Sequence, residues 1–84
     1  MSYRLIWAIS TQDDLLQILL RRPDRIAVVG ALNRLGTTLQ RQGSAAGESR
    51  EPNYRVLIDW PLGVKFSVDE LDRAVKITDI WAID

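Results

Sequence analysis

Two arginines, Arg50 and Arg55, are the residues of this chain best suited to chemistry. Arg55 lies in a run of alternating apolar and polar residues, which predicts a β-strand. If the residues on either side of Arg55 point into the core, Arg55 projects from the opposite face of the sheet, with Arg50 in or near the adjacent segment. Two guanidinium groups on one sheet face could hold a phosphate bidentately or meet a partner's carboxylate. Salt bridges to Glu48 or Asp59 are the structural alternative, which the residues alone slightly favour.

The lack of cysteine and histidine narrows the possible chemistry. It excludes thiolate catalysis, disulfides, a histidine general base and ordinary zinc sites. The net charge is zero, but residues 21–55 carry +4 and residues 56–84 carry −3. An arginine-rich middle suits an acidic partner or nucleic acid, although interspersed charge is also typical of a solvated helix face.

The remaining polar clusters predict turns rather than sites. Asp69, Glu70 and Asp72 fall in a tight hairpin, whereas two-carboxylate hydrolases need acids that face each other across a cleft. The same loop lacks the ligand spacing of a calcium site. Gly30 and Gly36 lie inside a predicted helix and lack the lysine of a phosphate-binding loop. We therefore expect no cofactor and no metal.

Residues 53–84 organise the chain, because they predict a three-stranded antiparallel meander. Apolar residues alternate with polar ones in three runs, which is typical of strands with one buried face. Pro61 and Gly63 break the first junction, and residues 69–72 break the second. The expected buried face is made of Tyr54, Val56, Ile58, Val64, Phe66, Val68, Val75 and Ile77.

A strand and a helix are predicted ahead of the meander. Residues 3–9 are rich in β-forming types. Ser10 or Thr11 then caps a helix whose first turn holds Asp13 and Asp14, where the helix dipole favours acids. The helix has a wide apolar face made of Leu15, Leu16, Ile18, Leu19 and Leu20.

A second helix is predicted from Pro23, which ends the first helix, to about residue 42. Gly43 is placed to cap it, and Glu48–Arg50 in the following loop could form a short edge strand. The apolar stripe of this helix is made of Val28, Leu32, Leu35 and Leu39, widened by Ile26 and Val29.

The order strand–helix–helix–strand–strand–strand predicts one α+β domain over residues 1–84. Its mostly antiparallel twisted sheet would carry a helical hairpin packed on one face. No apolar run approaches the roughly 20 residues that span a bilayer, and the N-terminus lacks a signal peptide's apolar core. We therefore expect a cytoplasmic protein with no membrane partner. Trp60 and Trp81 are expected to be exposed, where they would anchor a partner.

Several short stretches carry a family resemblance. They are Gly47-Glu48-Ser49-Arg50, Tyr54-Arg55-Val56, Pro61-Leu62-Gly63-Val64 with Phe66 and Val68-Asp69-Glu70, and Asp72-Arg73 followed by Val75, Ile77, Ile80 and Trp81. With the order of the elements, they make nearly the whole chain similar to the RelE/ParE superfamily of toxins from type II toxin–antitoxin systems.

The resemblance implies a small toxin that a co-encoded antitoxin holds inactive. RelE-like members cleave mRNA on the ribosome with basic and tyrosine residues, and ParE-like members inhibit DNA gyrase. Arg55 matches the strand arginine that contacts the scissile phosphate, and Arg50 falls near the neighbouring basic positions. With Arg73 they would form a catalytic set that stabilises a phosphorane electrostatically.

Two departures from the nucleases favour a toxin-like protein that acts by binding protein. A further arginine and a tyrosine follow the last strand in the nucleases, whereas this sequence ends at residue 84. The nucleases are also strongly basic, as a ribosomal partner demands, and this chain is neutral. The alternatives are a ribosome-dependent mRNA endoribonuclease that uses Arg50, Arg55 and Arg73, and a non-toxic interaction module that forms a homodimer through Trp60 and Trp81.

Overall fold

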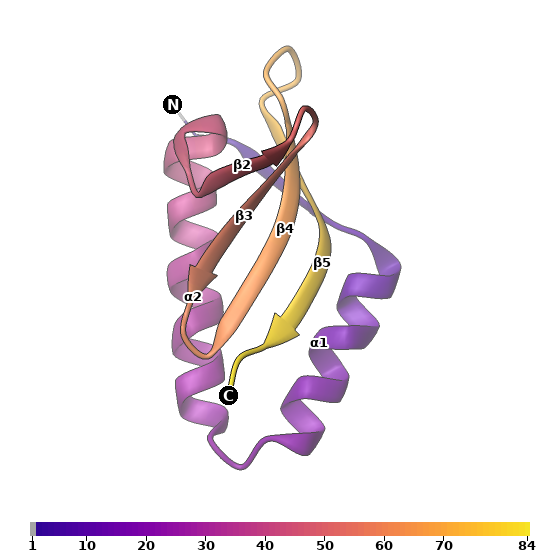
Figure 1. Ribbon diagram of the computed structural model, residues 1–84, viewed down its shortest axis with the longest axis vertical. Coiled ribbons are helices and arrows are strands. Elements are labelled where there is room, and N and C mark those ends of the chain that lie inside the picture. The colour runs from indigo at the N-terminus through magenta and orange to yellow at the C-terminus, as the bar shows by residue number, and fades with distance from the viewer. Residues whose placement is uncertain (1) are drawn as a thin grey trace.

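The computed structural model describes residues 2–84 and contains two long helices and a five-stranded sheet (Figure 1). This confirms the predicted α+β class and the order of its elements. A short edge strand, β2, is present where the sequence indicated that one could form. In chain order the elements are β1 (Arg4–Trp7), α1 (Ile9–Arg21), α2 (Arg25–Gln42), the 3₁₀ turn η1 (Gly43–Ala45), β2 (Glu48–Glu51), β3 (Tyr54–Asp59), β4 (Leu62–Asp69) and β5 (Ala74–Ala82).

The sheet is mixed, with the strand order β1-β5-β4-β3-β2. β2, β3, β4 and β5 are joined as antiparallel neighbours by short turns. β1 instead lies parallel to β5, because both helices intervene between β1 and the meander. The first and last strands of the chain therefore pair with each other.

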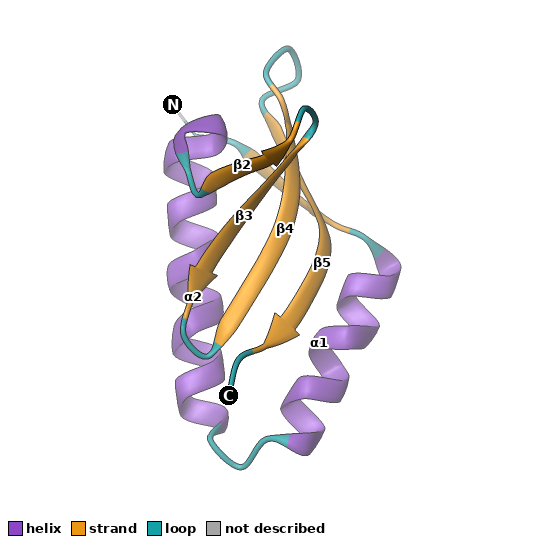
Figure 2. Cartoon of the chain, viewed as in Figure 1, coloured by secondary structure: helices purple, strands orange, loops and turns teal. Residues whose placement is uncertain are grey.

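Both helices lie against one face of the sheet, which we call the covered face (Figure 2). α1 packs against β5, while α2 packs against β1, β3 and β4. The opposite, uncovered face looks toward the viewer in Figure 1. Beneath the helices lies one apolar core, made of Tyr3, Val28, Ala31, Leu35, Leu39, Ala46, Leu62, Val64, Phe66, Val75, Ile77 and Ile80.

The first helix starts earlier than predicted. α1 begins at Ile9 with Ala8 as its cap, so Ser10 and Thr11 lie inside the helix and its first turn holds no acidic residue. The predicted cap is wrong because the Thr11 hydroxyl has another partner. It is fully buried and donates a hydrogen bond to the carbonyl oxygen of Ile77, 3.2 Å away in β5. This bond attaches α1 to the sheet.

The second helix begins two residues after Pro23, at Arg25. Its cap is Asp24, whose carboxylate is bound by the guanidinium of Arg22 at 2.9 Å and makes no side-chain bond to the helix. Ile26 is 92% exposed and Val29 is also exposed, so neither widens the buried stripe as predicted. The stripe itself is confirmed, with Leu32 partly buried and with full burial of Val28, Leu35 and Leu39.

The two faces of β3 are the reverse of those predicted. In the β3–β4 ladder, Arg55 pairs with Phe66 and Leu57 pairs with Val64. Directly paired residues lie on the same side of a sheet, and Phe66 and Val64 are fully buried under the helices. Arg55 and Leu57 therefore point to the covered face, whereas Ile58 is 52% exposed on the other.

The prediction that Tyr54, Val56 and Ile58 form the buried face is thus wrong. Both alternate sets of residues in this strand contain apolar side chains, so alternation alone does not identify the inner set. The prediction for β4 is confirmed, because Val64 and Phe66 are buried and Val68 packs against the core.

A bulge in β5 keeps its apolar residues on the covered face. Lys65 pairs with Asp79 and the next residue, Phe66, pairs with Ile77, which leaves Thr78 as the extra residue. As a result Ile77 and Ile80 are both buried although they are three positions apart. Within residues 2–84, no helix is long and apolar enough to cross a membrane.

Candidate functional site

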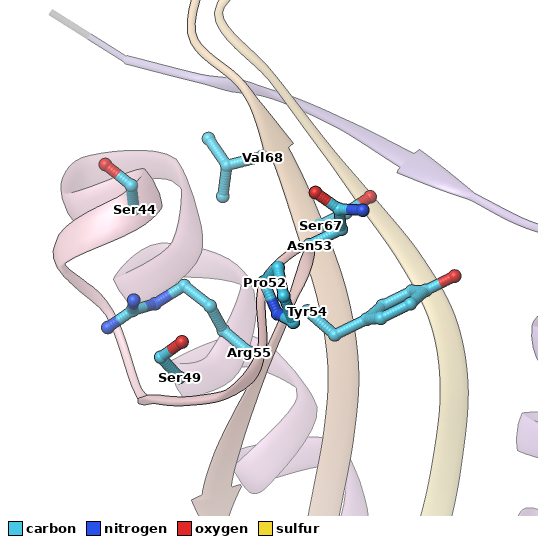
Figure 3. Close-up of a pocket in the computed structure, with 8 residues that line it drawn as sticks. All are labelled: Ser44, Ser49, Pro52, Asn53, Tyr54, Arg55, Ser67 and Val68. Carbon is cyan, nitrogen blue, oxygen red and sulfur yellow. The ribbon is translucent and has the colours of Figure 1, made fainter.

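Arg55 lines a pocket of about 280 Å³ between η1, the β2–β3 turn and β4 (Figure 3). Its guanidinium is the charged group of a lining that otherwise offers hydroxyls, an amide and apolar surface. In Figure 3 the guanidinium extends away from the Tyr54 ring. The lining residues are Ser44, Ser49, Pro52, Asn53, Tyr54, Arg55, Ser67 and Val68.

Two of the five N–H donors of Arg55 are committed to the backbone. Nε donates to the carbonyl oxygen of Ala46 at 2.8 Å, and Nη2 donates to that of Gly47 at 3.0 Å. Gly47 has a positive φ of 66°, and a Cβ there would collide with the carbonyl oxygen of Val56. Arg55 therefore fixes the tight turn that leads into β2, and Nη1 takes part in neither of these two bonds.

Arg50 does not join Arg55. It lines a separate pocket of about 350 Å³ together with Val56 and Ile58, on the uncovered side of β3. Its guanidinium lies 3.3 Å from the Glu48 carboxylate, and both side chains are exposed. The prediction that the two arginines share one sheet face is therefore wrong, because β3 presents Arg55 to the covered side.

Asp59, the other carboxylate weighed as a partner for these arginines, pairs with a third one. Arg34 of α2 binds it through Nε and Nη2 at 2.8–3.0 Å. Arg34 also donates to the carbonyl oxygen of Trp60 at 3.4 Å. This contact ties α2 to the end of β3, so Asp59 belongs to the scaffold.

Arg73 lies in the β4–β5 hairpin with a positive φ of 50°. Its Nη1 donates to the hydroxyl of Tyr3 at 3.1 Å and lies 3.5 Å from the Glu70 carboxylate, while its guanidinium sits over the Tyr3 ring at 4.9 Å. Glu70 also accepts hydrogen bonds from Tyr3 at 2.9 Å and from Ser44 at 2.6 Å. We call Tyr3, Ser44, Glu70 and Arg73 the Glu70 cluster.

The donors around Glu70 hold the pKa of its carboxyl group below the ordinary value of 4.5. The Ser44 hydroxyl contributes most, followed by the Tyr3 hydroxyl, and Arg73 adds a smaller part. Because Ser44 also lines the Arg55 pocket, the cluster and the pocket are neighbours. The three predicted arginines nevertheless lie in three different settings, of which the Arg55 pocket is the one suited to a small anion.

A larger, apolar pocket lies between the two helices and was not predicted from the sequence. It measures about 540 Å³ and is lined by Trp7, Gln12, Leu15 and Leu32, from β1, α1 and α2. We call it the helix groove. The sequence does contain a signal for it, because the apolar face of α1 is wider than the sheet contact requires and leaves leucines exposed. The exposed apolar residues of the two helices include Leu16, Leu20 and Val29.

In the part of the chain that the structure describes, no group of three or more acidic, histidine or cysteine side chains is arranged to hold a metal ion.

No protein-family model matches this sequence, and no curated protein matches it. Solved structures match in fold. A chain of the toxin–antitoxin complex RelBE2 from Mycobacterium tuberculosis is similar with a TM-score of 0.78 and 15% identity, over 98% of this chain and 92% of that one. A chain of the chromosomal ParDE toxin–antitoxin system from P. aeruginosa gives 0.67 and 19%, over 98% and 97%. A conserved hypothetical protein from Helicobacter pylori gives 0.61 and 9%, over 95% and 93%. These likenesses establish a RelE/ParE-like fold over nearly the whole chain.

Proposed function

We propose that this protein is the toxin-like component of a type II toxin–antitoxin system, that it acts by binding a protein, and that an antitoxin neutralises it. Its fold supports this proposal, because chains from RelBE2 and from a ParDE system resemble it from end to end. Its neutral charge favours a protein target over a ribosomal one. DNA gyrase is the target that the ParE likeness suggests.

The helix groove is the observation that carries the antitoxin part of the proposal. A groove of about 540 Å³ with an apolar lining is the kind of surface into which an amphipathic helix lays its apolar face. The same helix, α1, also carries the exposed leucines Leu16 and Leu20. An acidic residue in a second, extended part of the antitoxin would reach Nη1 of Arg55, and another would reach Arg50.

Growth of a bacterium that expresses the chain alone tests the toxin proposal. We expect growth to stop on induction and to recover when the neighbouring short reading frame is expressed with it. Leu16→Asp, at the exposed leucine of α1 that follows the groove-lining Leu15 in sequence, should stay toxic and lose this recovery. The matched control Leu71→Asp, at a residue 97% exposed in the β4–β5 hairpin, should retain it. Undisturbed growth with both the unmodified chain and Arg55→Ala would remove the claim of an active toxin.

A second candidate function is endoribonuclease activity, which the Arg55 pocket favours. Its guanidinium and surrounding hydroxyls would suit a phosphodiester. We expect Arg55 to carry such an activity without Arg50 or Arg73, because neither lines that pocket. Primer extension on transcripts after induction would test for this activity. We expect cleavage that is lost in Arg55→Ala and kept in Arg50→Ala. Inhibition of DNA supercoiling without transcript cleavage would favour the gyrase target instead.

A further inference from the structure

The uncovered face of the sheet carries a flat apolar area at one end, which we call the tryptophan shelf. Ile58, Gly63 and Trp81 lie side by side on β3, β4 and β5, because Ile58 pairs with Gly63 and Gly63 pairs with Trp81. Trp60 follows directly in the β3–β4 turn. Ile58, Trp60 and Trp81 are 52%, 56% and 36% exposed, so the shelf and the turn beside it present three large apolar side chains to solvent.

Gly63 is what makes the shelf flat. A Cβ at this position would lie 2.5 Å from Cε2 and 2.7 Å from Nε1 of Trp81, so the indole occupies the space above the glycine backbone. One face of the indole rests on β4 and the other remains available. A flat apolar surface on a sheet suits a second sheet packed face to face, whereas a helix needs a groove.

The uncovered face carries charges of both signs. Lys65 and Asp79 are cross-strand partners in the row next to it, yet neither forms an ion pair within residues 2–84. Lys65 lies over the Tyr54 ring at 4.2 Å, and Asp79 accepts a hydrogen bond from Thr78. By register, the charged residues of this face include Arg4, Lys65 and Lys76 against Glu48, Asp69 and Asp79. Arg50, the bulge residue of β2, lines a pocket with Val56 and Ile58 of the same face.

We propose that a second copy of this chain packs on the uncovered face, with the two tryptophan shelves in contact about a two-fold axis. A foreign charged partner would call for a face of one sign, whereas a balanced face complements itself. In a two-fold pair, Lys65 of one copy lies near Asp79 of the other. The covered face and its helix groove remain free, so a dimer can still bind the antitoxin helix in that groove.

The size of the face fits a reversible dimer. At about 3.4 Å per residue and about 4.8 Å between strands, the five strands cover a planar area of about 500 Å². Side chains raise the accessible area above this value, toward the roughly 800 Å² that each partner buries in a standard interface. Four of the exposed large apolar residues lie on this face or in its adjoining turn, namely Ile6, Ile58, Trp60 and Trp81.

Sedimentation velocity of the purified chain from about 1 µM to about 500 µM tests the proposal. The mass should rise from 9.6 kDa toward twice that value as the concentration increases. Ile58→Lys should raise the dissociation constant at least tenfold, and the milder Ile58→Thr, which keeps a β-branched side chain, should raise it severalfold. Leu71→Lys replaces an equally large and exposed apolar residue in the β4–β5 hairpin, outside the shelf. It should leave the dissociation constant unchanged.

A charge exchange tests the register of the pair. Lys65→Asp should weaken the dimer, because it faces Asp79 of the other copy, and Lys65→Asp combined with Asp79→Lys should restore it. A monomer at every concentration would overturn the proposal, as would equal effects of Ile58→Lys and Leu71→Lys. The inference depends on the sheet alone, so a negative growth assay would leave it standing.

Discussion

The two faces of the sheet differ in what holds their side chains in place. On the covered face, Phe66 and Ile77 are fully buried beneath the helices. On the uncovered face, Ile58 and Trp81 belong to the same ladders but remain exposed. The difference arises because the helices reach only one side. Packing energy is therefore concentrated on the covered face, and the uncovered face is free to serve an interaction.

Arg50 and Arg55 show the same difference at the scale of single residues. Arg55 points to the covered side, where its guanidinium holds two backbone carbonyl oxygens. Arg50 lies on the other side of β3 and meets the exposed carboxylate of Glu48. Two arginines that look equivalent in the sequence thus have different roles, and the face on which each lies decides which role it has.

Truncation of one residue on each face should give the largest contrast. Phe66→Ala should lower the free energy of unfolding by about 3–5 kcal/mol, because it opens a cavity in a closed core. Ile58→Ala should lower it by less than about 1 kcal/mol, since that side chain is half exposed. Urea denaturation of the two variants measures the difference. If Phe66→Ala does not fold, Phe66→Leu should still cost about 1 kcal/mol. Equal losses in Phe66→Ala and Ile58→Ala would mean that the faces do not differ in packing.

Most of the fold could be predicted from the sequence because its periodic signals agree. The stripe through Val28, Leu35 and Leu39 indicates a helix with one buried side, and Val64 and Phe66 indicate a strand with one buried side. The faces of β3 could not be predicted in the same way. Its apolar residues occur on both faces of the strand, so the pairing with β4 decides which face is buried.

Less of the candidate site could be predicted. Residue type identified Arg55 as a candidate, but its bonds to Ala46 and Gly47 depend on a turn that no local pattern encodes. The family resemblance placed Arg73 in a catalytic set with Arg55. In the structure Arg73 instead binds Tyr3, which lies at the other end of the chain. Contacts between residues distant in sequence are set by the topology, and single-sequence patterns report only local structure.

Removal of the two arginines should give the next largest contrast. Arg55→Ala should cost about 2 kcal/mol, because two backbone carbonyl oxygens lose a charged donor. Arg50→Ala should change the stability by less than about 0.5 kcal/mol, since its ion pair is exposed to solvent. Denaturation gives the total effect, and hydrogen exchange at residues 46–49 locates it. Faster exchange there in Arg50→Ala than in Arg55→Ala would reverse the roles assigned to the two arginines.

A substitution at Gly63 tests whether the uncovered face is as adaptable as its exposure indicates. Gly63→Ala should lift the Trp81 indole away from β4, because the new methyl group occupies its place. The loss should be limited to about 1 kcal/mol, since a half-exposed indole is free to move outward. Tryptophan emission should shift to longer wavelength. The dimer should weaken as well, because the shelf is no longer flat.

Mild acid should give the smallest effect and should act at one end of the covered face. The pKa of Glu70 is lowered in the folded protein, chiefly by the Ser44 hydroxyl and then by that of Tyr3. A carboxyl group with a lowered folded pKa stabilises the protein fully above its ordinary pKa of 4.5, and this contribution is lost as the pH falls through the folded value. Protection of residues 43–45 from hydrogen exchange, measured against the intrinsic exchange rate at each pH, should therefore fall below pH 4.5, while tryptophan emission stays unchanged. Carboxyl NMR titration provides the control: Ser44→Ala should raise the pKa of Glu70 toward 4.5 and leave unchanged that of Asp24, which Arg22 lowers. If Ser44→Ala leaves the pKa of Glu70 unchanged, Tyr3 and Arg73 are the groups that lower it. In that case η1 is held to the hairpin by packing alone.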